Sequence, residues 1–266
     1  LAEEATSPWL PLVGPGGEIR GLVDLVSFRK QHHRLPNAAV LMAGGRGERL
    51  LPLTEDQPKP MMSVGGRPIL ETLVRILHGH GIERFYLSVN YLAEQIEDHF
   101  GDGSAFGVDI RYLREERPLG TAGSVRPLVE TESEPILVIN GDVLSRVNPR
   151  TILDYHRQEG AAATVAVREH RVEVPFGVVE IDGNRLVKVR EKPTETYFIN
   201  AGIYVVEPGQ LGLIPADQRF DMTDLLQRIG QKDGSHVACF PVPEYWVDIG
   251  RVEDLERARR EFTENF

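Results

Sequence analysis

Glycines and basic residues that follow an apolar run near residue 40 have the types and spacing of a polyphosphate site. The run ends at Ala43, and the residues that carry the pattern are Gly44, Gly45, Gly47, Arg49 and Lys59. Glycine lets the backbone approach a ligand closely, and successive backbone N–H groups in such a turn form an anion-binding concavity. The arginine and the lysine add positive charge for phosphate oxygens. We expect a phosphate-binding loop here, and an ordinary glycine-rich surface turn is the alternative.

This loop differs from two better-known phosphate loops. A Walker loop needs G-x-x-x-x-G-K-[ST], and no such string follows Gly44. A dinucleotide-binding loop needs G-x-G-x-x-G that opens directly into a helix, whereas Pro52 and Pro58 oppose a helix here. The loop therefore belongs to neither class.

Asp142 closes a second apolar run, which begins at Leu137. Ligands in open α/β sheets bind at the carboxyl ends of strands, so Asp142 and the glycine loop can face one cleft. Mg²⁺ takes one or two carboxylates together with phosphate oxygens, which makes Asp142 a natural ligand. Capping of the next helix is the alternative, because Asp is favoured at helix starts.

The string from Gly44 to Met61, GGRGERLLPLTEDQPKPM, resembles the signature of sugar-1-phosphate nucleotidyltransferases, G-G-x-G-x-R-L…P-L-T…K-P. The matching residues are Gly44, Gly45, Gly47, Arg49, Leu50, Pro52, Leu53, Thr54, Lys59 and Pro60. The resemblance extends over about residues 37–266. It implies an enzyme that joins an NTP and a sugar-1-phosphate and releases pyrophosphate.

The same resemblance assigns the nucleotide side of the site. It implies that Ala43 and the three glycines bind the nucleotide and that Arg49 holds the leaving β- and γ-phosphates. Lys59 then neutralises the α-phosphate. Asn90, which follows another apolar run, approaches the nucleotide.

The resemblance also implies a bound Mg²⁺. In the family an aspartate at the position of Asp142 binds the metal, and the W-x-D-x-G motif supplies a second carboxylate, here Asp248. The alternative for Asp248 is a turn residue that precedes Gly250 and the next helix.

A second glycine-flanked segment indicates where the base lies. Gly120, Thr121 and Ala122 start a predicted helix, whose N-terminus offers free N–H groups and partial positive charge. Capping by Thr121 is the alternative. The string PLGTAG from Pro118 resembles the base-reading loop of the family, and its GTAG variant is similar to that of guanylyltransferases acting on mannose-1-phosphate. GTP is therefore the favoured nucleotide.

Four further residues resemble the sugar site of the family. In the E-K-P motif, Glu191 would accept hydrogen bonds from sugar hydroxyls and Lys192 would orient the sugar phosphate. Gly177 would offer its backbone and Asn200 its amide to the sugar. A solvated Glu–Lys pair at a strand end is the alternative for the motif.

The substrates expected are an NTP, favouring GTP, and a mannose-, glucosamine- or heptose-type sugar-1-phosphate. UTP or dTTP with glucose-1-phosphate is one alternative, and a regulatory subunit that binds nucleotide sugar without turnover is another. A glycosyltransferase would carry a D-x-D motif, which Asn140-Gly141-Asp142 is not.

Composition narrows the partners. The net charge is −10 over 266 residues, whereas nucleic-acid binders are usually basic, so no nucleic acid is expected. No apolar run approaches the roughly 20 residues of a membrane span. The single cysteine, Cys239, suggests a reducing compartment and a cytoplasmic location. Whether the chain forms a homo-oligomer stays open.

Strand-like and helix-like segments alternate from residue 37, which predicts a Rossmann-like α/β fold with a mostly parallel central sheet flanked by helices. The expected strands are 38–43, 84–89, 108–113 and 135–140. The expected helices are 69–80, 93–100, 122–129, 151–158, 221–229 and 253–264. Strands over 163–167, 177–181, 186–190 and 198–206 predict a smaller antiparallel, sugar-binding part that covers one side.

We expect two units, an N-terminal extension over 1–34 and a catalytic domain over 35–266. The extension has a strand–glycine turn–strand pattern over 9–25 and a short helix over 25–33. It is similar to the end of a CBS module. An extension packed on the catalytic domain explains it equally well.

Overall fold

A seven-stranded sheet forms the centre of the computed structural model, which describes residues 9–24 and 34–266. The strand order is β14-β10-β13-β8-β3-β6-β7. The bounds are β3 (Ala38–Met42), β6 (Arg84–Val89), β7 (Asp109–Arg114), β8 (Ile136–Asn140), β10 (Ala163–Glu173), β13 (Thr194–Val206) and β14 (Val237–Pro241). Only the pairs that β13 makes with β8 and β10 are antiparallel. The expected mostly parallel sheet is confirmed.

The alternating direction of strand side chains explains the two layers of helices. Along β3, Ala39 and Leu41 pack into one core cluster, and Ala38 and Val40 pack into another. The first cluster is covered by α2 (Ile69–Gly79), α3 (Ala93–Phe100) and α5 (Pro149–Glu159). The second is covered by α4 (Gly120–Gly123) and α6 (Met222–Gly230). Among the described helices none is long and apolar enough to cross a membrane.

A small two-stranded sheet lies beside the carboxyl end of β8. It pairs β9 (Val143–Ser145) with β15 (Trp246–Asp248), and the amide of Ile249 donates to the carbonyl of Asp142 at 3.0 Å. α7 (Val252–Asn265) follows directly, and its Leu255 packs with Val247 in a third cluster. This arrangement joins two segments that are far apart in the sequence.

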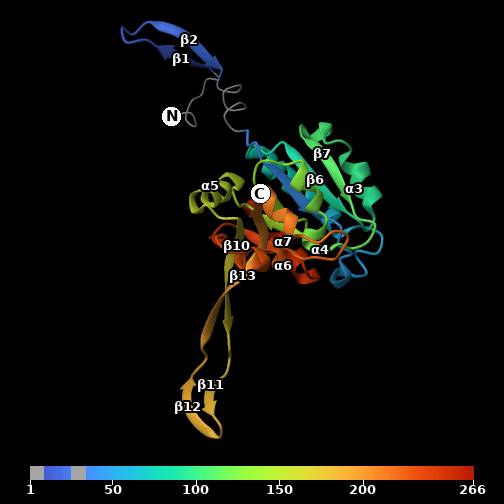
Figure 1. The fold of residues 1–266 in the computed structure, drawn as a ribbon, viewed down its shortest axis with the longest axis vertical. Coiled ribbons are helices and arrows are strands. Elements are labelled where there is room, and N and C mark those ends of the chain that lie inside the picture. The colour runs from blue at the N-terminus through green and yellow to red at the C-terminus, as the bar shows by residue number, and fades with distance from the viewer. Residues whose placement is uncertain (1–8, 25–33) are drawn as a thin grey trace.

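The antiparallel part projects from the sheet, contrary to the expectation that it covers one side. β10 and β13 run on past their neighbours and connect to the hairpin of β11 (Val178–Asp182) and β12 (Arg185–Arg190) (Figure 1). We call residues 168–199 the arm, the part of the sheet from which its two strands leave the root of the arm, and the rest of residues 34–266 the body. β10 is longer than predicted because Arg168, Glu169 and His170 lack the polar–apolar alternation by which a half-buried strand is recognised. β13 is also longer and begins at Thr194, four residues before the expected start.

One predicted helix is also interrupted. The segment expected as a helix over 122–129 forms α4 and then a 3-10 helix over Arg126–Glu130. Pro127 lies at the start of the second piece, where its missing N–H cannot continue the hydrogen bonding of the first.

The N-terminal strand pattern forms a hairpin of β1 (Trp9–Val13) and β2 (Ile19–Asp24), as expected. The helix expected over 25–33 lies outside the described residues. The division into an extension and a catalytic domain, and the likeness to a CBS module, stay predictions.

Candidate active site

The glycine loop follows β3 and closes against the segment that carries Lys59. Gly47 has a φ of 64°, and a Cβ on it would lie 3.0 Å from Lys59 Cβ and 3.1 Å from Thr54 Cγ2. The hydroxyl of Thr54 donates to the carbonyl of Gly47 at 2.9 Å. Nothing lies within 4 Å of the corresponding position on Gly45, so that part of the loop stays open to a ligand. Positive φ and close packing together require glycine at position 47.

Lys59 lies between the two aspartates that were expected to bind metal. Its ammonium group donates to Asp142 Oδ2 and lies 4.0 Å from Asp248 Oδ1. Only 9% of the Lys59 side chain is exposed. Asp142 follows β8, and Asp248 ends β15, so the β9–β15 pairing brings the two carboxylates to one place. The expected juxtaposition of these three residues is therefore present.

The pKa of Asp248 reflects the negative charge of Asp142 beside it. Burial raises the pKa of Asp248, the charge of Asp142 raises it further, and Lys59 and Arg49 oppose that shift. A cation beside the pair would relieve the same repulsion. Two carboxylates fit Mg²⁺, which completes its shell with phosphate oxygens and water. No cluster of three or more His, Cys, Asp or Glu suited to a metal occurs in residues 9–24 and 34–266.

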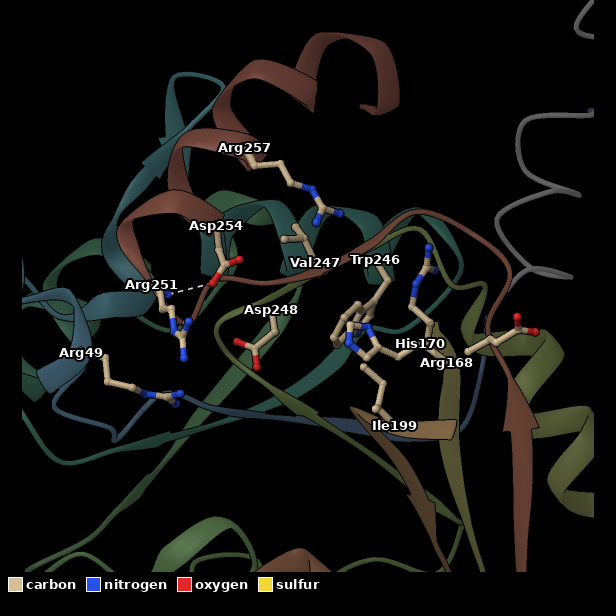
Figure 2. A pocket seen from close by; sticks show the side chains of 12 residues that line it. Arg49, Arg168, His170, Ile199, Trp246, Val247, Asp248, Arg251, Asp254 and Arg257 are labelled. Atoms are coloured by element: carbon tan, nitrogen blue, oxygen red, sulfur yellow. Dashed lines mark hydrogen bonds between the residues drawn. The ribbon is translucent and has the colours of Figure 1, made fainter. Parts of the chain in front are cut away.

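An arginine-rich pocket of about 320 Å³ adjoins Asp248. Figure 2 shows the side chains of Arg49 and Arg251 on either side of the space beside this carboxylate. The pocket extends to the root of the arm, where Arg168 donates to the carbonyl of Glu244 at 2.6 Å. Sequence reasoning found Arg49 through its motif. It missed Arg168 and Arg251, which no motif marks.

Glu115 links the two loops expected to hold the nucleotide, and sequence reasoning missed it. Its carboxylate accepts from Ser88 Oγ and from the amide of Leu119, both at 2.7 Å. Its carbonyl accepts from Asn90 Nδ2 at 2.6 Å. A Cβ on Gly44 would lie 3.0 Å from its Oε1. Its place just before PLGTAG was the only signal that could have found it.

The predicted base-reading loop is anchored by the segment just before α6. The amide of Thr121 donates to Asp221 Oδ1 and that of Ala122 to the carbonyl of Phe220, each at 2.9 Å. The expectation of free N–H groups at this helix start is therefore wrong for these two residues, because the chain before α6 crosses the start of α4. Gly120, with a φ of 79°, lies against the same segment.

The predicted sugar residues are divided between the arm and its root. Asn200 lies at the root, accepts from the amide of Gly202 and donates to Tyr204 Oη, both at 2.9 Å. Gly177, Glu191 and Lys192 lie in the arm. Six register pairs beyond the root, from Arg168–Ile199 to Glu173–Thr194, place them about 20 Å farther out. Within a single chain these three residues therefore lie away from Lys59. Their roles in sugar binding stay predictions.

The chain is similar to known nucleotidyltransferases over most of its length. Residues 38–265 match the family described as "Nucleotidyl transferase". A UTP–glucose-1-phosphate uridylyltransferase of Synechocystis is 33% identical over 84% of this chain, and a mannose-1-phosphate guanylyltransferase of Mycobacterium tuberculosis is 36% identical over 82%. The chain spans 62% of the length of each of these relatives.

The fold is also similar to solved structures. HddC from Yersinia pseudotuberculosis is 27% identical, with a TM-score of 0.67, over 85% of this chain and 99% of that one. A structure of the same protein complexed with GMP-PN has a TM-score of 0.66 at 26% identity. Relatives that differ in the nucleotide of their names therefore lie at similar identity to this chain.

Proposed function

The chain belongs to the nucleotidyl transferase family, and on that premise we propose that it transfers a nucleoside monophosphate from an NTP to a sugar-1-phosphate. The observation that carries the proposal is the buried Lys59 between Asp142 and Asp248, beside an open glycine loop. A buried ammonium, two carboxylates and an anion-binding turn meet the needs of phosphoryl chemistry, which depends on positioning and charge neutralisation.

In the proposed reaction an oxygen of the sugar phosphate attacks the α-phosphorus of the NTP. A new P–O bond forms, the bond from the α-phosphorus to the bridging oxygen breaks, and pyrophosphate leaves with the electron pair. Lys59 neutralises charge that develops on the α-phosphate, and Arg49 holds the departing phosphates. Lys192 orients the attacking phosphate. Correct alignment of the two phosphates supplies much of the rate.

Asp142 and Asp248 are the residues that would hold Mg²⁺. The bound ion would supply charge neutralisation to the nucleotide and sugar phosphates. Lys59 contacts the same carboxylates, so its positive charge reduces the repulsion between them before substrate binds.

GTP with a mannose-, glucosamine- or heptose-type sugar-1-phosphate is the favoured pair. The GTAG string, the similarity to a mannose-1-phosphate guanylyltransferase and the fold of a protein solved with GMP-PN support it. UTP or dTTP with glucose-1-phosphate is the alternative, supported by the similarity to a UTP–glucose-1-phosphate uridylyltransferase.

Pyrophosphate release measured for every NTP with a panel of sugar-1-phosphates tests the proposal. One nucleotide should give turnover with one class of sugar. Absence of turnover with every pair would contradict the proposal and favour a subunit that binds nucleotide sugar without reaction.

Substitution of Arg49→Ala should lower turnover by about 10²–10³, because it removes a donor that acts on charge in the transition state. Arg46→Ala is the matched control. Arg46 lies in the same loop with its guanidinium 5.9 Å from the Tyr91 ring centroid, and it occupies the variable position of the motif. Near-normal turnover of the Arg49 variant would show that the site is wrongly assigned.

A further inference from the structure

The arm exposes large apolar side chains that no other described part of its own chain covers. Nine of its large apolar side chains are exposed, namely Val172, Phe176, Val179, Ile181, Leu186, Val187, Val189, Tyr197 and Phe198. At the tip, Val179 pairs with Val189, so both point to one face, while Glu180 and Lys188 pair on the other. A two-stranded ribbon of this kind is marginally stable in water unless a further layer covers it.

The root of the arm is fastened so that the arm points away from the body (Figure 1). The carbonyl of Val167 accepts from the amide of Val242 at 2.9 Å. On the other strand, Trp246 Nε1 donates to the carbonyl of Ala201 at 2.8 Å. Together with the Arg168–Glu244 hydrogen bond, these contacts hold the base of both strands of the arm to residues 242–246. These contacts fix the direction in which the arm leaves the body.

The arm therefore leaves the proposed site of its own chain incomplete. Lys192 is exposed and makes no hydrogen bond or ion pair within the part of the chain that the structure describes. The nucleotide side of the site, in contrast, is assembled around Lys59. Because its own arm points away, the site can receive this group from the arm of a second copy.

The charge of the arm permits close approach to another copy. Its six basic residues, Arg168, Arg171, Arg185, Lys188, Arg190 and Lys192, equal in number its six acidic residues, Glu169, Glu173, Glu180, Asp182, Glu191 and Glu195. The arm has no net charge from these groups, whereas the whole chain has −10. An arm without net charge meets less repulsion from an acidic body than an acidic arm would.

We propose that the arm docks on a second copy of this chain and that two copies exchange arms. In a two-fold dimer each arm buries its apolar face on the other protomer and brings Lys192 to the site built around the partner's Lys59. This inference rests on the proposed function for the role of Lys192. The docking itself rests on the uncovered face and the fastened root.

Sedimentation equilibrium in the absence of substrate tests the docking. The chain should be a dimer, and the triple variant V179S/I181S/V189S should be a monomer with an unchanged circular dichroism spectrum. K188A, on the opposite face of the tip, is the control and should stay dimeric. A monomeric wild-type chain, or a dimer unaffected by the triple variant, would overturn the proposal.

Heterodimers test the exchange. K59A and K192A chains with different tags are co-expressed, and dimers that carry both tags are isolated. If arms are exchanged, one of the two sites is intact and turnover is about half that of the wild type, although each homodimer is inactive. If each arm serves its own body, both sites are defective and the heterodimer is inactive, which overturns the exchange. Full activity of the K192A homodimer overturns it as well.

The two experiments separate the proposals. A wild-type dimer that loses association in the triple variant but has no turnover with any substrate pair contradicts the proposed function and supports the docking. An active monomer supports the function and overturns the docking.

Discussion

Lys59 combines burial with charge, a combination that costs free energy unless the charge is paired. Its partners are the carboxylates of Asp142 and Asp248, of which 26% and 48% are exposed. The lysine therefore satisfies two acidic groups in the free protein, and the same groups fit a divalent cation. The ammonium group of Lys59 and a divalent cation would therefore compete for the same two carboxylates.

Lys59→Ala should destabilise the chain by about 1–3 kcal/mol, because the carboxylates lose their charged partner. Added Mg²⁺ should raise the melting temperature of this variant more than that of the wild type, since the ion no longer competes with the ammonium group. Thermal unfolding over a Mg²⁺ titration measures both effects. The added Asp142→Asn change should remove the extra shift, and equal Mg²⁺ shifts in wild type and Lys59→Ala would show that the carboxylates do not bind the ion.

His156 gives the stability a defined pH dependence. The ring is 1% exposed, with Nδ1 2.8 Å from Thr164 Oγ1 and Nε2 3.2 Å from Glu207 Oε1. Burial lowers the pKa of His156 below 6.5 in the folded state, and Glu207 opposes that shift. The unfolded chain therefore binds the proton first. The contribution of His156 is complete above pH 6.5 and is lost as the pH falls from there through the folded-state pKa.

Urea unfolding at about pH 7.5 and 5.5 should show a smaller loss of stability for His156→Gln than for the wild type, because glutamine takes up no proton. His170→Gln, which changes an exposed histidine, is the control and should follow the wild type. Equal pH dependence in the wild type and His156→Gln would rule out His156 as the source.

At the scale of elements, glycine at position 120 is required by the meeting of α4 with the start of α6. A Cβ there would lie 2.6 Å from Asp221 Oδ1 and 2.7 Å from the carbonyl oxygen of Phe220. Gly160, at the end of α5, also has a positive φ, 59°, but nothing lies within 4 Å of its Cβ position. A comparison of substitutions at the two glycines therefore separates the cost of the backbone conformation from the cost of close packing.

Gly160→Ala should cost about 1–2 kcal/mol, the cost of a left-handed conformation for an L-residue. Gly120→Ala should cost about 1–3 kcal/mol more, because overpacking against backbone adds to that cost. It should also weaken nucleotide binding, since the loop must shift. Urea unfolding and nucleotide titration measure these changes. Equal losses of stability in the two variants would mean that the contact with Phe220 relaxes freely.

At the scale of the whole molecule, the described core of the body is built without the arm. None of the three buried clusters contains a described residue of the arm. The body therefore needs no part of the arm for its core, and the arm carries three of the four predicted sugar residues.

Replacement of residues 174–193 by Asn-Gly should leave the body folded. Glu173 and Thr194 are paired, and a two-residue Asn-Gly turn suits such a hairpin. The stability of the monomer in dilute solution should change by less than about 1 kcal/mol, since no core residue is removed. Nucleotide binding should persist and sugar transfer should be lost. Loss of cooperative unfolding would show that the arm is part of the folding unit.

Much of this protein can be predicted from the sequence alone. The continuous apolar run of β3 and the 3.6-residue spacing in α2 identify their elements, because a central strand is buried on both faces and a surface helix on one. The glycine loop, Lys59 and Asp142 are found by residue type and position, because glycine permits the backbone conformation of Gly47 and charged groups at strand ends mark a site. Asp248 is found through the resemblance of its motif to that of the family.

What the tertiary structure alone decided depends on contacts between distant segments. The β9–β15 pairing brings Asp248 to Lys59, Glu115 joins two loops, and Phe220 and Asp221 accept from the N–H groups of α4. The projection of the arm is of the same kind, because residue types predict strands but leave open whether their exposed face meets the same chain or another. Such pairings depend on which surfaces meet, and no local period or motif encodes that.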